Sequence, residues 1–192
     1  ATWLVSWLSS SGYVDLVRTV FELAAFYLLV TQSPLSKKRS LLAGIFLGLA
    51  IGVKWHALGS LLLLAVLFSP FILPTAFLFA SPWMYLAYRF TGNPLYPLFE
   101  KFMTATQLAQ VGSNYYAPLS VLSRFITAPI FLTRPSEDFL SPVIGIIYLL
   151  ALPGLLSGNK VIRKIALFGV LGTFLLLLTP PPSTRYFLPY LP

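Results

Sequence analysis

Residues 81–97 read SPWMYLAYRFTGNPLYP, an aromatic-rich apolar segment that runs into a Gly-Asn-Pro turn. Trp and Tyr gather where a membrane helix meets water, because the ring is apolar while its N–H or O–H needs a polar partner. Pro94 disfavours the α conformation at Asn93, and Gly92 readily adopts turn conformations, so a helix should end here. The stretch predicts a helix that emerges from a bilayer into an ordered external loop at about residues 90–140.

The composition also indicates a membrane protein. Hydrophobic residues make up 57% of the 192 residues and charged residues only 9%, whereas soluble domains carry about 25% charged residues. The net charge of +8 comes from 13 Lys and Arg residues that long apolar runs separate, so we expect a lipid bilayer as partner and no nucleic acid. The absence of Cys excludes disulfides and thiolate metal sites.

Apolar runs of roughly 17–25 residues can cross a bilayer as helices. We therefore expect an all-α, polytopic transmembrane helical bundle with six spans and the start of a seventh. The chain begins with Ala rather than Met and stops soon after its last apolar run opens, so we expect residues 1–192 to be a single transmembrane module from a longer chain. The expected spans are Tyr13–Thr31, Leu41–Trp55, two arms within Ala57–Arg89, Ser141–Ser157, Ile165–Thr179 and a run that opens at Tyr186.

Two short basic segments set the expected orientation. Lys37–Arg39 and Lys160–Lys164 should both lie in the cytoplasm, because positive charge favours that side. An even number of crossings must then separate them, which requires a hairpin broken at Ser69-Pro70 and Pro74. This arrangement predicts a multi-pass integral protein of the plasma or inner membrane, with its active site facing outside.

Gly44, Gly48 and Gly52 recur every four residues and therefore lie on one face of the second expected span. Such a stripe lets two helix backbones approach closely. We interpret it as a packing surface.

Asp15 stands at the expected external mouth of the first span, with Arg18 and Glu22 on the same helical face at i+3 and i+7. One interpretation is a cluster of ion pairs that neutralises itself among the helices. The other is a polar cavity, which ionisable groups near a membrane helix mouth often mark. The residue pattern alone leaves both open.

Four motifs occur in an order that resembles the bacterial and archaeal GT-C glycosyltransferases, polytopic relatives of the protein mannosyltransferases. They are Gly12-Tyr13-Val14-Asp15, the Gly48–Lys54 segment, the Pro-Trp to Gly-Asn-Pro exit at 82–97, and the Arg185-Tyr186 corner. The resemblance implies a cell-envelope hexosyl or pentosyl transferase. Such an enzyme moves a sugar from a polyprenyl-phosphate donor to a hydroxyl acceptor on the external face.

The resemblance also suggests roles for particular residues. Asp15 would position the acceptor hydroxyl or a divalent cation, while Lys54 and Arg185 would hold the donor phosphate, since Arg can grip a phosphate through two hydrogen bonds. Lys54 has a plainer interpretation as an interfacial anchor beside a Trp. The family's defining acidic residue has no counterpart here, so we expect the catalytic base to precede Ala1. His56, Asn93 and Tyr96 are candidates for a substrate-contacting loop.

Metal dependence stays open at this level. The chain shows no His, Asp and Glu cluster with metal-ligand spacing, although a divalent cation is compatible with the resemblance. Two other functions are alternatives. A transporter or flippase would need broken helices at matching positions in two halves, and Pro70 and Pro74 break one hairpin without such a counterpart. A non-catalytic membrane subunit is the other.

Overall fold

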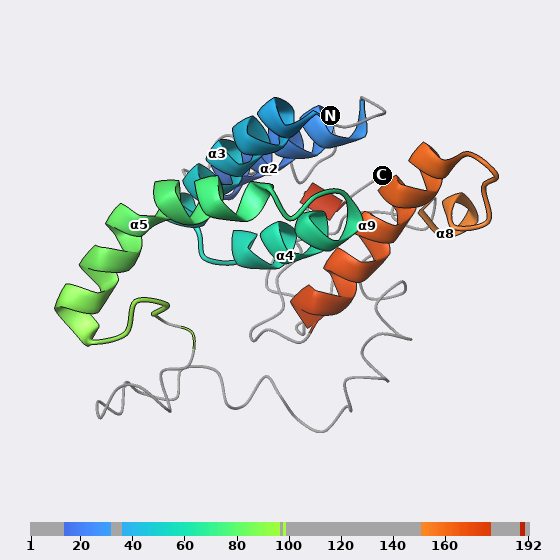
Figure 1. Cartoon of the computed structure of the whole chain (residues 1–192). Coiled ribbons are helices and arrows are strands. Elements are labelled where there is room, and N and C mark those ends of the chain that lie inside the picture. Colours follow the sequence, from blue (N-terminus) through green and yellow to red (C-terminus); the bar gives the residue numbers. More distant parts are fainter. Residues whose placement is uncertain (1–13, 32–35, 97, 99–150, 178–188, 191–192) are drawn as a thin grey trace, which may run out of the picture.

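The computed structural model describes residues 14–31, 36–96, 98, 151–177 and 189–190 (Figure 1). In these ranges the chain forms helices and no strands, so the all-α part of the predicted fold class is confirmed there. A short 3₁₀ turn covers residues 189–190. The helices are α2 (Asp15–Val30), α3 (Lys37–Val53), α4 (Ala57–Leu67), α5 (Ile72–Thr91), α8 (Ala151–Gly154) and α9 (Lys160–Leu177).

The predicted transmembrane bundle is wrong, and so is the multi-pass membrane localisation that rested on it. Among the described residues, no helix combines the length and the apolar character that a membrane crossing requires. Helices α2, α3 and α4 hold 16, 17 and 11 residues, or about 17–26 Å against a hydrocarbon core of about 30 Å. Helices α5 and α9 hold 20 and 18 residues, but Thr75, Ser81, Pro82 and Arg89 lower the apolar character of α5, and α9 includes Lys160, Arg163 and Lys164.

Part of that prediction falls on segments that the structure does not describe. Three expected features lie mostly outside the described residues: the span Ser141–Ser157, the external loop at 90–140 and the run that opens at Tyr186. The bounds predicted from the apolar runs also differ from the observed helix ends. The run Leu41–Trp55 was expected as one span, whereas α3 begins four residues earlier at Lys37 and ends at Val53.

The glycine stripe is the packing surface between α3 and α5, as the sequence predicted. A Cβ added at Gly44 would collide with the Thr75 hydroxyl and the backbone oxygen of Ile72. One added at Gly48 would lie 2.5 Å from the backbone oxygen of Ala76. The Thr75 hydroxyl also donates across the interface to the Leu41 carbonyl at 2.9 Å. Only glycine therefore permits this distance between the two helices.

The predicted break between the two arms of 57–89 is confirmed near Ser69 and Pro70. Helix α4 ends at Leu67 and α5 begins at Ile72, and the Ser69 hydroxyl accepts a hydrogen bond from the Phe71 backbone N–H at 3.3 Å. Pro74 does not break the chain, contrary to expectation. It lies in the first turn of α5, where a backbone N–H would have no partner within the helix.

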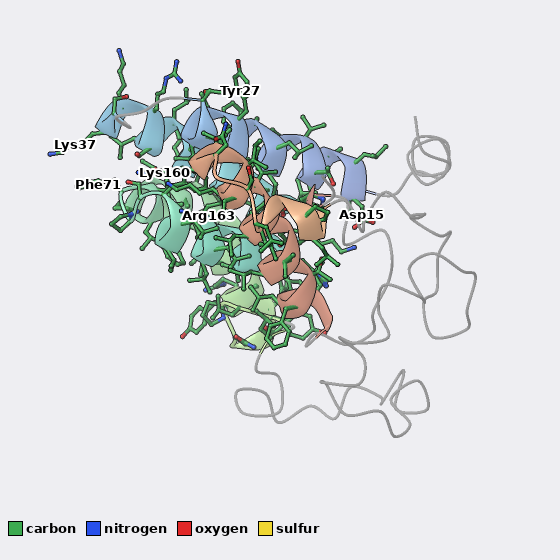
Figure 2. All side chains as sticks on the ribbon, turned by 90° about the vertical axis from the view of Figure 1, so that its right-hand side faces the viewer. Asp15, Tyr27, Lys37, Phe71, Lys160 and Arg163 are labelled. Atoms are coloured by element: carbon green, nitrogen blue, oxygen red, sulfur yellow. The ribbon has the colours of Figure 1, made fainter. Side chains whose placement is uncertain are left out.

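One lysine of each basic segment lies against an aromatic ring of the α4–α5 turn. The Lys37 ammonium lies 5.2 Å from the centre of the Phe71 ring, and the Lys164 ammonium lies 4.4 Å from that of Phe68. Figure 2 shows Lys37 beside Phe71 at one end of the helices and Asp15 toward the other. The candidate residue Asp15 and the basic segments therefore lie at opposite ends of the helical assembly.

Aromatic rings join α2 and α9 to the end of α4. Phe26 stacks on Phe168 with ring centres 4.8 Å apart and meets Phe68 edge-on at 5.9 Å. Buried aliphatic residues from four helices complete this core: Ala25, Leu29, Leu47, Leu61, Leu64 and Ile72.

The predicted end of α5 is confirmed at Gly92. Its φ of 74° lies in the left-handed region that favours glycine, and its N–H donates to the Tyr88 carbonyl at 2.8 Å. Asn93 then leaves the helix, as the following proline predicted.

Candidate functional site

Helix α2 turns its polar residues inward. Asp15, Arg18, Thr19 and Glu22 are all less than a tenth exposed, and they share one face because they are spaced three or four residues apart. The opposite face is apolar and exposed, at Val14, Val17, Val20, Leu23 and Tyr27. The ionisable residues that the sequence placed on one face therefore point into the helical assembly.

The carboxylate of Asp15 forms an ion pair with Lys54. Lys54 Nζ lies 2.8 Å from Asp15 Oδ1, and the two side chains are 17% and 0% exposed. Lys54 follows α3 directly with an extended backbone, at φ −160° and ψ 122°, while its own N–H still closes the helix onto Ala50. The extended backbone at the end of α3 therefore brings the Lys54 side chain to Asp15, the first residue of α2. Within this pair, only the lysine is partly exposed.

A second set of contacts lies one turn further along α2. Arg18 Nε lies 3.3 Å from Glu22 Oε1, and both side chains are buried. The Ser60 hydroxyl of α4 donates to Glu22 Oε2 at 2.9 Å. The same hydroxyl lies 2.6 Å from the Tyr190 hydroxyl, where either oxygen can be the donor. Ser60 therefore links the carboxylate of α2 to the C-terminal 3₁₀ turn.

Tyr190 reaches this position because α9 makes room for its ring. A Cβ added at Gly172 would collide with the Tyr190 ring, and the Phe168 ring centre lies 5.0 Å from that of Tyr190. A larger residue at position 172 would displace the tyrosine from Ser60.

Burial shifts the pKa values of Glu22 and Tyr190 in this second group of contacts. The pKa of Glu22 is raised from its ordinary value, chiefly because burial penalises the carboxylate, although Arg18 and the Ser60 hydrogen bond oppose the rise. Burial also raises the pKa of Tyr190, and the nearby Glu22 charge adds to that rise. Tyr190 is therefore a neutral phenol at physiological pH.

The other sequence candidates fall in three places. His56 is buried in the corner between α3 and α4, two residues after Lys54, and its ring stacks on Trp55 at 4.1 Å. Asn93 is buried in the turn after α5, where its side chain accepts from the Leu95 N–H at 2.9 Å and donates to the Leu98 carbonyl at 2.5 Å. Arg185 lies outside the described residues.

Asn93 and Tyr96 thus belong to a turn that their own hydrogen bonds shape. The Tyr96 N–H donates to the Asn93 carbonyl at 3.2 Å, and the other hydrogen bonds described for Asn93 also fall within residues 91–98. These contacts explain why Asn follows Gly92 here. They bring neither residue to the Asp15–Lys54 pair.

Sequence reasoning missed Ser60 and Tyr190. Ser60 had one available signal, since it is the single hydroxyl residue in the apolar α4 sequence ALGSLLLLAVL. Tyr190 lies 130 residues further along the chain, and no local pattern indicates its partner.

Within the described ranges, no group of three or more His, Cys, Asp or Glu side chains could hold a metal ion. Comparisons of the chain with protein-family models, with curated proteins and with solved structures find no match.

Proposed function

We propose that this protein transfers a sugar from a polyprenyl-phosphate donor to a hydroxyl acceptor at the Asp15–Lys54 pair. The observation that carries the proposal is the 2.8 Å contact between these side chains, which come from different helices and are 39 residues apart. The sequence motifs suggested that Asp15 positions the acceptor hydroxyl and that Lys54 binds the phosphate of the sugar donor. A transferase needs both roles within one site.

The pair suits the two halves of the reaction. A carboxylate can accept several hydrogen bonds at once, so Asp15 orients the acceptor hydroxyl toward the sugar. An ammonium carries three donors, so Lys54 donates to a phosphate oxygen of the donor. The acceptor hydroxyl gives up its proton to a base other than Asp15 as its oxygen bonds to the sugar. The bond from the sugar to the phosphate breaks in the same step, so negative charge grows on the leaving phosphate, and a fixed cation stabilises this charge.

The partial exposure of Lys54 supports the donor half of this assignment. Its side chain is 17% exposed, whereas that of Asp15 is fully buried. A charged ligand would therefore meet the lysine first. The competing interpretation is that the ion pair is purely structural. In that case, variants of the pair that still fold would transfer sugar at the normal rate.

The test is transfer of labelled sugar from a short-chain polyprenyl-phosphate sugar, presented in detergent micelles, to a soluble hydroxyl acceptor. Lys54→Ala should weaken use of the donor about tenfold to a hundredfold, the range expected when a charged hydrogen bond of about 1.5–3 kcal/mol is lost. The matched control is Lys38→Ala, which removes an exposed lysine near the start of α3. If the two lysine variants transfer sugar equally well, the donor role of Lys54 is wrong.

A further inference from the structure

Three buried ionisable side chains of α2 and the partly exposed Lys54 that follows α3 form two neighbouring ion pairs, which we call the charge cluster. Lys54 pairs with Asp15 at 2.8 Å and Arg18 pairs with Glu22 at 3.3 Å, and the Asp15 charge links the two pairs because it acts on the pKa of Glu22. With every member ionised, two negative charges balance two positive charges. A buried cluster is most stable near neutrality, because a net charge held away from water is costly. An anion that binds at the lysine would disturb this balance.

Glu22 is the residue of the cluster that can restore the charge balance, by taking up a proton. Its carboxyl meets the Ser60 hydroxyl at 2.9 Å, and that hydroxyl meets the Tyr190 hydroxyl at 2.6 Å. A hydroxyl both donates and accepts, so this chain of hydrogen bonds can run in either direction. With Glu22 ionised, Tyr190 donates to Ser60 and Ser60 to the carboxylate. With Glu22 protonated, the carboxyl donates to Ser60 and Ser60 to Tyr190. Both protonation states therefore keep the two hydrogen bonds of this chain, and in the second state the hydrogen of the Tyr190 hydroxyl turns away from Ser60.

In the part of the chain that the structure describes, several elements bring charged or hydroxyl groups toward Glu22. On α2 they are Arg18, which lowers the Glu22 pKa, and Asp15, which raises it. On α4 the group is Ser60, and beyond it stands Tyr190 beside α9. The charged residues of α3 lie at its ends, in Lys37–Arg39 and at Lys54. Those of α9 lie in its first turns, at Lys160, Arg163 and Lys164.

We propose that binding of the donor phosphate at Lys54 is coupled to uptake of one proton by Glu22. The carboxylate takes the proton from solvent and becomes a neutral carboxyl, while the Ser60 and Tyr190 hydroxyls reverse their hydrogen bonds. The cluster then gains one negative charge from the phosphodiester and loses one at Glu22. This inference rests on the proposed function for the identity of the anion. The raised pKa of Glu22 agrees with it.

The probe is a farnesyl methyl phosphodiester in detergent micelles, whose phosphate keeps a single charge near neutral pH. Binding is followed by calorimetry between pH 5 and 8, in two buffers with different ionisation enthalpies, so that proton uptake is measured directly. The wild-type protein should take up as much as one proton per phosphodiester. Its affinity should fall by at most tenfold per pH unit as the pH rises above the Glu22 pKa.

Three variants make the test specific. Glu22→Gln should bind without proton uptake and with an affinity independent of pH, whereas His56→Asn should keep the uptake. Ser60→Ala removes a hydrogen bond that lowers the Glu22 pKa, so the pH at which affinity falls should move upward. Ser60→Ala also keeps the test decisive if Glu22→Gln does not fold.

Several results would overturn the coupling. They are uptake that persists in Glu22→Gln, uptake that disappears in His56→Asn, an unmoved pH dependence in Ser60→Ala, and no binding by folded wild-type protein. Sugar transfer without proton uptake would contradict this inference alone. Proton-coupled binding without any sugar transfer would contradict the proposed function alone.

Discussion

Lys54 Nζ lies 2.8 Å from Asp15 Oδ1, so the residue that follows α3 neutralises the residue that begins α2. Removing one member of such a pair leaves the other charge buried without its counter-charge, which costs about 3–5 kcal/mol of folding stability in comparable sites. Replacing both members by neutral groups avoids most of that cost.

The first prediction follows from this relationship. Asp15→Asn and Lys54→Gln should each destabilise the fold, whereas the double variant should lose less than the sum of the two. A coupling of about 0.5–3 kcal/mol is expected, because residues in direct contact depart from additivity by this amount. Denaturant unfolding followed by circular dichroism measures all four proteins. Strict additivity would show that the contact contributes nothing.

A second prediction concerns the hydroxyl between Glu22 and Tyr190. Ser60→Ala should lower the free energy of unfolding by about 1–3 kcal/mol, because it removes a partner from a buried carboxylate. The control is Ser81→Ala, since the exposed Ser81 hydroxyl donates only to a carbonyl of its own helix, that of Leu78. An exposed change of that kind should stay within about 0.5 kcal/mol. Equal effects at the two serines would contradict the buried network.

The third prediction tests the close approach of α3 and α5. Gly48→Ala should destabilise the fold by about 1–3 kcal/mol or more, because the added methyl group meets the Ala76 backbone, which cannot move independently. Gly158→Ala is the matched control, since an added Cβ there would meet nothing within 4 Å. If both variants melt at the wild-type temperature, the α3–α5 interface is less tight than described.

A fourth prediction uses the protonation of Glu22. Its pKa in the folded protein lies above the ordinary value of 4.5, so the folded state binds the proton more tightly than the unfolded chain. The stability that this proton contributes is present below pH 4.5 and is lost as the pH rises through the folded pKa. The loss amounts to about 1.4 kcal/mol per unit of pKa difference.

Glu22→Gln removes this dependence, so the stability difference between the variant and the wild type should shift in favour of the variant as the pH rises. Unfolding titrations from pH 4 to pH 8 give the comparison. Parallel curves for the two proteins would mean that Glu22 titrates normally.

Local patterns in the sequence predicted the local features well. The end of α5 at Gly92, the break near Pro70 and the glycine stripe are each set by neighbouring residues, through backbone conformation or side-chain size. The shared face of Asp15, Arg18 and Glu22 follows from helical spacing in the same way.

Long-range features could not be predicted in this way. Hydrophobic composition does not fix where a helix begins and ends, and the predicted spans failed for that reason. The basic residues at the starts of α3 and α9 belong to those helices, whereas the expected spans Leu41–Trp55 and Ile165–Thr179 left them outside. The contact of Ser60 with Tyr190 joins positions 130 residues apart, so it depends on how α4 and α9 pack.

The central claim is that Asp15 and Lys54 act on substrates in addition to stabilising each other. The most direct measurement is sugar transfer by the double variant Asp15→Asn with Lys54→Gln, beside its unfolding free energy. We predict that the double variant regains much of the stability that either single variant loses, while its transfer rate stays at least about tenfold below wild type. Recovery of transfer together with stability would contradict the claim and leave the pair a structural contact.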